Sequence, residues 1–113
     1  MISGHEVLQR FADRLRTNLG AEHVYLFGSH ATGRAAPDSD YDLIIVSRSF
    51  EAVPRIRRGM GIRGIFYDVG GFAPLDLICL TPEEFESAKG RATLVREVLP
   101  EAIDLLAEEP ASA

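Results

Sequence analysis

Residues 24–46 read VYLFGSHATGRAAPDSDYDLIIV, and this stretch decides how the chain folds. An apolar run at residues 24–27 predicts a short buried strand. A second strand is expected over residues 41–47, and because it is apolar on both sides after its acidic start, both of its faces should be covered. The loop between the strands, residues 29–39, is rich in small and turn-forming residues and has room for one helical turn after its start.

The sequence on either side of this stretch predicts further elements. Ser3 opens a helix with a capping box, and apolar residues recur at helical spacing until Gly20 provides a stop signal. Residues 72–80 predict a third strand, which follows a pair of glycines. Residues 48–71 are the least regular part: their apolar spacing suggests a helix after Pro54, but several glycines weaken it.

Two more helices are expected after the third strand. Thr81 and Glu84 form a second capping box at the start of the first of them. Apolar residues over 94–99 form a helical stripe, and Pro100 is expected to kink that helix or to start another one that carries residues 103–106. The order of elements predicts the α/β (α+β) class, with helices packed on a small mixed β-sheet.

Length and charge limit the kind of protein that this is. The 113 residues are enough for one domain, residues 1–113, with a frayed tail at residues 108–113. The formal net charge of −5 argues against a protein whose whole surface binds nucleic acid. The basic run from Arg55 to Arg63 could bind phosphate or an acceptor, although a solvated helix face is the ordinary interpretation of such a run.

The remaining composition points to a reducing compartment. Cys79 is the only cysteine, so no disulfide can form within the chain. The N-terminal residues lack the basic and apolar regions of a signal peptide, and no apolar stretch approaches the ~18 residues that a membrane span needs. We therefore expect a cytoplasmic protein that does not enter a membrane.

Three aspartates are candidates for a metal site. Asp40 and Asp42 flank one residue at the start of the second strand, so their side chains point to the same face with Cα atoms ~6.6 Å apart. Asp76 can join them if the third strand is the neighbour of the second. Taken singly, each has an ordinary alternative role in a cap, a turn or a strand edge. Together they need a compensating cation, and two Mg²⁺ ions could bind between these carboxylates and substrate phosphates.

The loop before these aspartates has the features of a phosphate-binding bend. Gly28 allows the backbone to approach a phosphate closely, and Ser29 adds a hydroxyl beside N–H groups at a helix start. Gly33 is expected to turn the loop back, and Arg34 could meet phosphate charge. The pattern is neither a dinucleotide-binding GxGxxG nor a P-loop, since Gly33 is followed by arginine and alanine.

Three other side chains have less specific interpretations. His30 is expected to be an exposed loop histidine, with an approach to phosphate or base as the alternative. Tyr41 should face away from the aspartates and pack in the core. Cys79 should be buried and inert.

The Gly-Ser pair, the ten-residue spacer and the D-x-D pair resemble the signature of the nucleotidyltransferase superfamily that includes DNA polymerase beta. The short chain and the SD-x-DL ending look most like the minimal nucleotidyltransferase family, over residues 22–80. The resemblance implies a nucleotidyltransferase fold in which the Gly-Ser pair binds the nucleoside triphosphate and the D-x-D pair binds metal. It also implies that Asp76 helps to activate the acceptor hydroxyl.

The same resemblance implies a substrate and a partner. The transferred group would be AMP from ATP, and the chain has no room for the extra domain that larger relatives use to bind an acceptor. In the minimal family a separately encoded helical HEPN-domain protein often fills this role, in toxin–antitoxin pairs where the transferase is the antitoxin and some members transfer AMP to a tyrosine. Two functions stay open: a protein adenylyltransferase-like enzyme, and a non-catalytic antitoxin module that only binds its partner. Self-association also stays open.

Overall fold

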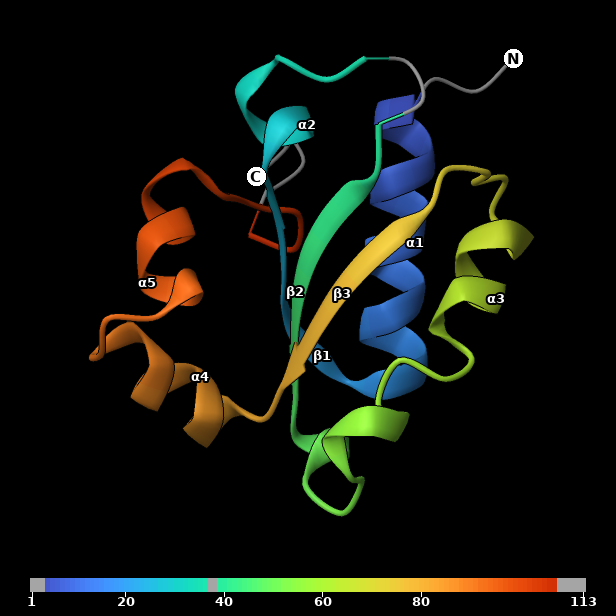
Figure 1. Cartoon of the computed structure of the whole chain (residues 1–113). Coiled ribbons are helices and arrows are strands. Elements are labelled where there is room, and N and C mark those ends of the chain that lie inside the picture. The colour runs from blue at the N-terminus through green and yellow to red at the C-terminus, as the bar shows by residue number, and fades with distance from the viewer. Residues whose placement is uncertain (1–3, 37–38, 108–113) are drawn as a thin grey trace.

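The computed structural model describes residues 4–36 and 39–107. Its strands form one sheet in the order β3-β2-β1-β4 (Figure 1). Strand β1 runs antiparallel to β2 and β4, whereas β2 and β3 are parallel, so the predicted mixed sheet is confirmed. The strands are β1 (Ala21–Phe27), β2 (Tyr41–Ser47), β3 (Leu75–Leu80) and β4 (Ile103–Asp104).

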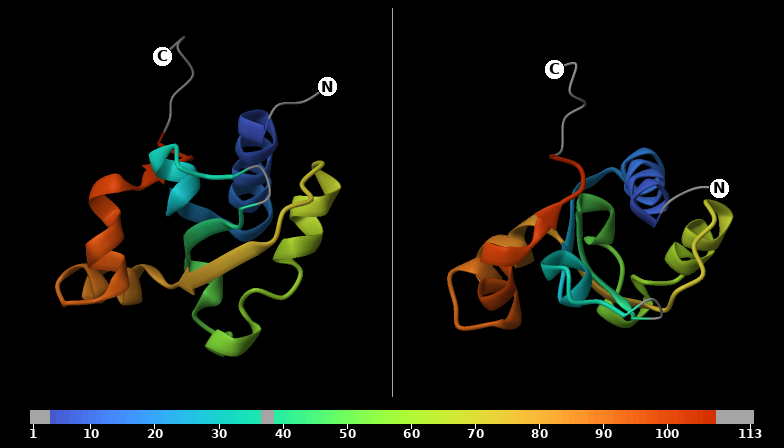
Figure 2. Two further views of the ribbon diagram at one scale, coloured as in Figure 1. Left: turned by 45° about the horizontal axis from the view of Figure 1, so that its top comes forward. Right: turned by 90° about the horizontal axis from the view of Figure 1, so that it is seen from above.

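Helices cover both faces of this sheet (Figure 2). Helices α1 and α3 lie against one face, and α4 and α5 lie against the other. The helices are α1 (Gly4–Leu19), α2 (Ser29–Thr32), α3 (Ile62–Asp68), α4 (Pro82–Lys89) and α5 (Leu94–Val98), and the short 3-10 turns are η1 (Arg48–Phe50), η2 (Arg55–Arg57) and η3 (Leu99–Glu101). None of the helices in the described residues is both long enough and apolar enough to cross a membrane.

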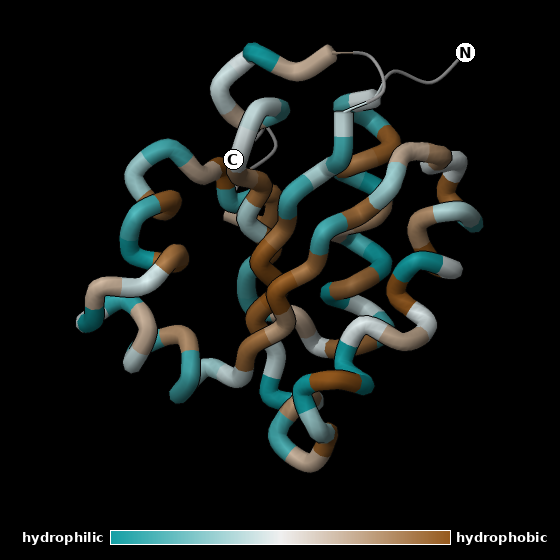
Figure 3. The backbone as a smooth tube through the Cα atoms, in the orientation of Figure 1, coloured by the Kyte–Doolittle hydropathy of each residue, from teal (hydrophilic) through white to brown (hydrophobic). Residues whose placement is uncertain are grey.

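Strand β2 serves two hydrophobic cores, one on each face. Leu43 and Ile45 belong to the core under α1 and α3, whereas Ile44 and Val46 belong to the core under α4 and α5. This alternation explains why the strand is continuously apolar and why Figure 3 shows hydrophobic residues through the middle of the sheet. The prediction that both faces of this strand are covered is confirmed.

Several predicted boundaries agree with the structure. Helix α1 ends where Gly20 takes a positive φ of 64°, a conformation that glycine adopts without strain. Helix α4 begins with the predicted capping box, in which Thr81 and Glu84 bond each other's backbone N–H. The capping role of Ser3 and the frayed tail at residues 108–113 lie outside the described residues.

Loss of the α4 cap gives a first testable prediction. The Thr81 side chain accepts the backbone N–H of Glu84 at 3.1 Å. Thr81→Ala removes this acceptor and should lower the free energy of unfolding by about 1 kcal/mol. Urea unfolding measures the change, with Thr81→Ser as the control because serine keeps the hydroxyl. Equal losses in the alanine and serine variants would contradict the assignment.

The prediction of a helix over residues 103–106 is wrong. Pro100 sits in the 3-10 turn η3, and the chain then pairs with β1 as the two-residue strand β4. The pairing continues beyond the strand, since the Leu105 N–H donates to the Val24 carbonyl at 2.8 Å. The reason is tertiary: β1 has a free edge here, and backbone hydrogen bonds to that edge outweigh a weak helical pattern.

The helix expected after Pro54 is also misplaced. Only the single turn η2 forms there, and the true helix α3 starts at Ile62, after Gly61 at a positive φ of 84°. Arg58 lies directly after this turn, and its side chain is only 6% exposed. It donates to the Val53 carbonyl at 2.9 Å and to the Cys79 carbonyl at 3.2 Å, so the chain turns inward where a helix would have continued.

The basic run from Arg55 to Arg63 therefore has a structural role that its composition does not indicate. Arg58 reaches the Cys79 carbonyl and Arg63 reaches the Leu75 carbonyl at 3.0 Å, and both carbonyls belong to the edge strand β3. Side chains that occupy the backbone groups of an edge strand protect it from pairing with another chain. The expectation of a solvated helix face is wrong for Arg58.

Candidate active site

The carboxylates of Asp42 and Asp76 meet at the start of two neighbouring strands. Asp42 lies directly opposite Asp76 in the parallel pairing of β2 with β3. Both side chains point to the sheet face that α4 and α5 cover farther along the strands, because Ile44, two residues after Asp42, belongs to that core. Asp42 is half-buried, whereas Asp76 is exposed and open to an incoming molecule. Asp40, exposed as well, precedes β2.

This arrangement raises the pKa of the Asp42 carboxyl above its usual value. Burial is the largest cause, followed by the negative charges of Asp76 and Asp40, while His30 acts in the opposite direction. A hydrogen bond with the Asp76 side chain adds to the rise, because it favours one proton between the two carboxyls. The site thus concentrates negative charge where a cation would relieve the repulsion.

Gly28 packs directly against this carboxylate. Phe27, the last residue of β1, pairs with Asp42, so the chain leaves β1 beside the Asp42 side chain. Gly28 has φ 75° and ψ −155°, a region that residues with a side chain essentially never occupy. A Cβ atom at this position would lie 2.2 Å from the Asp42 Oδ2 atom. The position therefore requires glycine for two independent reasons, conformation and space.

Gly28→Ala should accordingly damage both stability and the site. The backbone strain alone costs about 1–3 kcal/mol, and the methyl group must also displace the Asp42 carboxylate. We expect a clear drop in the urea midpoint and, if the bend binds a nucleotide as the sequence predicts, loss of that binding, measured by calorimetry. Gly20→Ala is the matched control, because Gly20 also has a positive φ, lies outside the loop, and has nothing within 4 Å of its would-be Cβ. It should destabilise without the effect on binding, and equal binding losses in the two variants would contradict the role of Gly28.

Ser29 begins the short helix α2 directly after this bend. The first N–H groups of a helix have no partner within the helix. Within the described residues no backbone carbonyl outside the helix accepts from the N–H of Ser29 or His30, so both could meet an anion. Gly33 ends α2 in the left-handed conformation, with φ 78°, which confirms that it turns the loop back. Arg34 follows as an exposed residue whose backbone N–H donates to the Ser29 carbonyl at 2.9 Å.

His30 is not the exposed loop histidine that the sequence suggested. Its ring stacks on Tyr41 with centroids 3.9 Å apart, and its Nε2 atom donates to the Ser39 carbonyl at 3.0 Å. Tyr41 in turn packs against the first core and meets the edge of Phe66, so its predicted orientation away from the aspartates is confirmed. His30 therefore fastens the loop between the Gly-Ser bend and the D-x-D pair to the body of the domain.

The carboxylates fit a site for a hard divalent cation at which the protein supplies only some of the ligands. Carboxylate oxygens are the donors that Mg²⁺ prefers, and Mg²⁺ usually keeps several waters and substrate phosphates beside one or two carboxylates. Within residues 4–36 and 39–107, no three His, Cys, Asp or Glu side chains gather closely enough to hold a metal by themselves. Asp42 and Asp76 therefore offer an open, two-carboxylate site, with Asp40 at its edge.

A profile of the nucleotidyltransferase domain matches residues 8–111. The chain belongs to the nucleotidyltransferase domain family. Among curated proteins, none is significantly similar in sequence to it.

Two solved structures resemble this nucleotidyltransferase domain in fold. A protein of Sulfolobus solfataricus assigned as a nucleotidyltransferase superposes with a TM-score of 0.57 at 18% identity, over 88% of this chain and 77% of that chain. BolA1 from Arabidopsis thaliana superposes with a TM-score of 0.55 at 19% identity, over 74% of this chain and 98% of that chain. At these identities both likenesses describe the fold alone, which two differently named proteins share.

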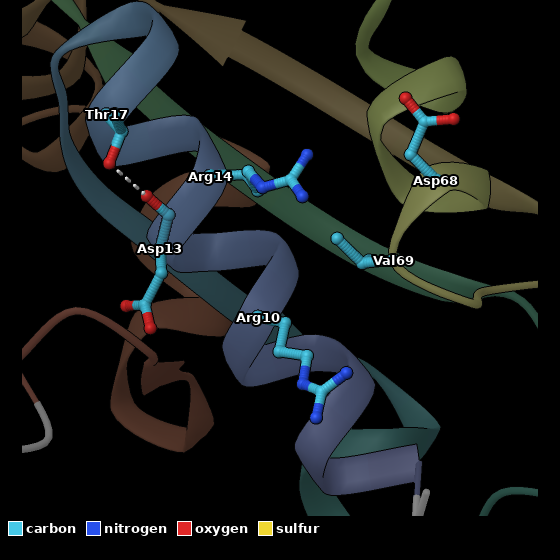
Figure 4. Close-up of a pocket in the computed structure, with 6 residues that line it drawn as sticks. All are labelled: Arg10, Asp13, Arg14, Thr17, Asp68 and Val69. Carbon is cyan, nitrogen blue, oxygen red and sulfur yellow. Dashed lines mark hydrogen bonds between the residues drawn. The ribbon is translucent and has the colours of Figure 1, made fainter.

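One concave surface of the nucleotidyltransferase domain lies away from the carboxylates. A cavity of about 340 Å³ lies between α1 and α3 (Figure 4). Helix α1 contributes Arg10, Asp13, Arg14 and Thr17 to its lining, and Asp68 and Val69 complete it. It contains none of the signature residues. The candidate site lies on an open edge of the sheet, because Asp76 is on the edge strand β3 and both Asp40 and Asp76 are exposed.

The structure adds two residue roles that the signature does not reveal. The close packing of Gly28 on Asp42 depends on the pairing of β1 with β2, and the stacking of His30 on Tyr41 depends on the path of the loop. Cys79, predicted to be buried, is half-buried, and burial raises the pKa of its thiol to about 11. It is therefore protonated at neutral pH, in agreement with an inert thiol.

Proposed function

We propose that this nucleotidyltransferase domain transfers AMP from ATP to a hydroxyl group of an acceptor in a reaction that requires Mg²⁺. The observation that carries the proposal is the pairing of the Asp42 and Asp76 carboxylates directly beside the Gly28 bend. Family membership supports nucleotidyl transfer in general, and the choice of AMP and Mg²⁺ rests on the signature and on the oxygen-only donor set.

Each residue has a defined task in the proposed reaction. The Ser29 hydroxyl and the free N–H groups of α2 bind the terminal phosphates, with Gly33 shaping the loop and Arg34 adding positive charge. Asp42 and Asp76 would hold the cation, and Asp40, at the edge of the site, would add negative charge. When bound, Mg²⁺ neutralises phosphate charge and aligns the nucleotide for in-line displacement.

The chemical step needs a base next to the acceptor. Asp76 is exposed, so it can accept the proton of an incoming hydroxyl. The acceptor oxygen forms a bond to the α-phosphorus, the bond from that phosphorus to the leaving oxygen breaks, and pyrophosphate departs. We further propose that the acceptor is a separate protein, a helical HEPN-domain partner modified on a tyrosine, and that the pair acts as toxin and antitoxin. Support for this partner is the family resemblance and the open edge on which the site lies.

The test uses ATP labelled on the α-phosphate, Mg²⁺ and a purified helical HEPN-domain protein as the acceptor. The label should move to that protein, and intact mass should rise by one AMP group. Asp76→Asn should abolish the transfer, while Asp68→Asn, which removes an exposed charge on α3, should leave it unchanged. Binding of the partner with no mass change and no label transfer would overturn the enzymatic proposal in favour of a binding module.

A further inference from the structure

Residues 54–61 form an outward-facing turn, which we call the η2 turn, at the end of the sheet opposite to the carboxylates. Asp42 and Asp76 lie at the starts of β2 and β3, whereas the η2 turn contacts Cys79 near the end of β3. Figure 1 shows this green segment below the strands, far from α2. Its side chains Ile56 and Met60 are 91% and 75% exposed, the first being the most exposed large apolar residue that the structure describes.

The η2 turn is held in place rather than loosely tethered. Its backbone closes successive turns, with the Arg57 N–H donating to the Pro54 carbonyl at 2.9 Å and the Met60 N–H to the Arg57 carbonyl at 3.1 Å. Arg58 anchors it from inside, through two backbone carbonyls and the carboxylate of Glu84. Exposing large apolar side chains to water costs free energy, and a partner that covers them removes that cost.

The charge of the η2 turn narrows the class of partner. Arg55 lies 3.4 Å from Glu84, so its charge is partly compensated. Arg57 is exposed, and within the described ranges it makes no ion pair. The surface thus combines two apolar side chains with a free guanidinium between them, and its complement is an apolar surface edged by carboxylates.

We propose that the η2 turn docks into a groove of a partner protein, where Ile56 and Met60 fill apolar pockets and Arg57 meets acidic residues at the rim. A symmetric contact between two copies is disfavoured, because it would bring Arg57 against its own counterpart. The turn has no aromatic residue on which a nucleotide base could stack, and the chain is acidic overall, which disfavours nucleic acid and anionic membranes.

Crosslinking followed by affinity measurement tests the proposal. A photoreactive benzoylphenylalanine replaces Ile56 in the native host, and a second chain carries it at Leu94, an exposed position on α5, as the control. The protein captured only from position 56 is then purified and titrated against purified variants. Ile56→Asp and Met60→Asp should each weaken binding at least ten-fold, and Arg57→Glu should weaken it more at low than at high salt. Leu94→Asp should have no effect.

The variants should keep their fold, because the replaced side chains are exposed, and circular dichroism checks this. Their ATP binding should equal that of the unchanged protein, since the η2 turn lies at the far end of the strands from Asp42 and Asp76. Unchanged affinity of the Ile56→Asp and Met60→Asp variants would overturn the proposal. So would the capture of nucleic acid or of a second copy of this chain, or the absence of any adduct specific to position 56.

Discussion

Replacement of Glu84 by alanine should lower the free energy of unfolding by about 3 kcal/mol, the lower end of the range for breaking a buried ion pair. The Arg58 guanidinium is nearly inaccessible to water, and Glu84 is the carboxylate that it reaches. The two terminal nitrogens of the guanidinium, Nη1 and Nη2, lie 2.5 Å and 3.3 Å from the two carboxylate oxygens of Glu84. Without that partner a buried positive charge keeps only neutral carbonyl acceptors. We choose the lower end because Glu84 itself is partly exposed.

Two further variants separate the contribution of the Glu84 charge to stability from that of its role in the helix cap. Glu84 also accepts the Thr81 N–H at 2.9 Å, and glutamine can keep that bond while losing the charge. Glu84→Gln should therefore destabilise less than Glu84→Ala. Arg58→Met combined with Glu84→Ala should be more stable than Glu84→Ala alone, because no buried charge is left without a partner. If the double variant is as unstable as the sum of the single ones, the two residues are not coupled.

The stabilisation by Glu84 should depend on pH. Arg58 holds the pKa of Glu84 down at about 2, below the usual value of 4.5. A carboxyl whose pKa is lower in the folded than in the unfolded protein stabilises the fold at pH values above the unfolded pKa, and this contribution disappears as pH falls towards the folded pKa. The difference in stability between the unchanged protein and Glu84→Gln should be full at pH 7 and should shrink between about pH 4.5 and pH 2.

The parts of the fold that local patterns specify could be predicted from the sequence. The apolar run of β2 and the cap at Thr81 carry their own signals, a continuous hydrophobic stretch and a side chain that bonds the first turn. Arg58 gives no such signal, because an arginine in a polar, glycine-rich segment looks like a solvent-exposed residue. Its burial depends on Glu84 and on the Cys79 carbonyl, which lie more than 20 residues farther along the chain.

Part of the candidate site could likewise be predicted from the sequence, and part depends on tertiary structure. That Asp40 and Asp42 share a face follows from strand alternation, which the sequence shows directly. That Asp76 lies opposite Asp42 is a matter of register between two strands joined by a long crossover, and a shift of one residue would have turned Asp76 to the other face. The fold alone does not select the function, since BolA1 resembles it nearly as well as the Sulfolobus solfataricus protein does. The signature residues carry the functional argument.

Asp42→Asn should make the protein more stable while it removes activity. Burial and the charges of Asp76 and Asp40 raise the pKa of Asp42 in the folded protein above 3.8. A carboxyl with a raised folded pKa costs stability once pH exceeds the unfolded pKa, and the full cost is present above the folded pKa. A neutral asparagine of the same size removes that cost. We expect a gain of up to about 1 kcal/mol at pH 7, since the carboxyl is only half-buried, and the gain should vanish below about pH 4.

The same substitution should reduce nucleotidyl transfer by about 10²- to 10³-fold, the loss typical of removing one group that stabilises transition-state charge. Asparagine is a neutral ligand and cannot supply the negative charge by which the proposed site would attract a divalent cation. Urea unfolding at pH 7 and pH 4, together with transfer from ATP labelled on the α-phosphate, measures both effects in one preparation. Asp68→Asn serves as the control and should change neither. A variant at Asp42 that gains stability and still transfers AMP would show that the acidic pair is structural, whereas a variant that loses both would place Asp42 among the residues that hold the fold.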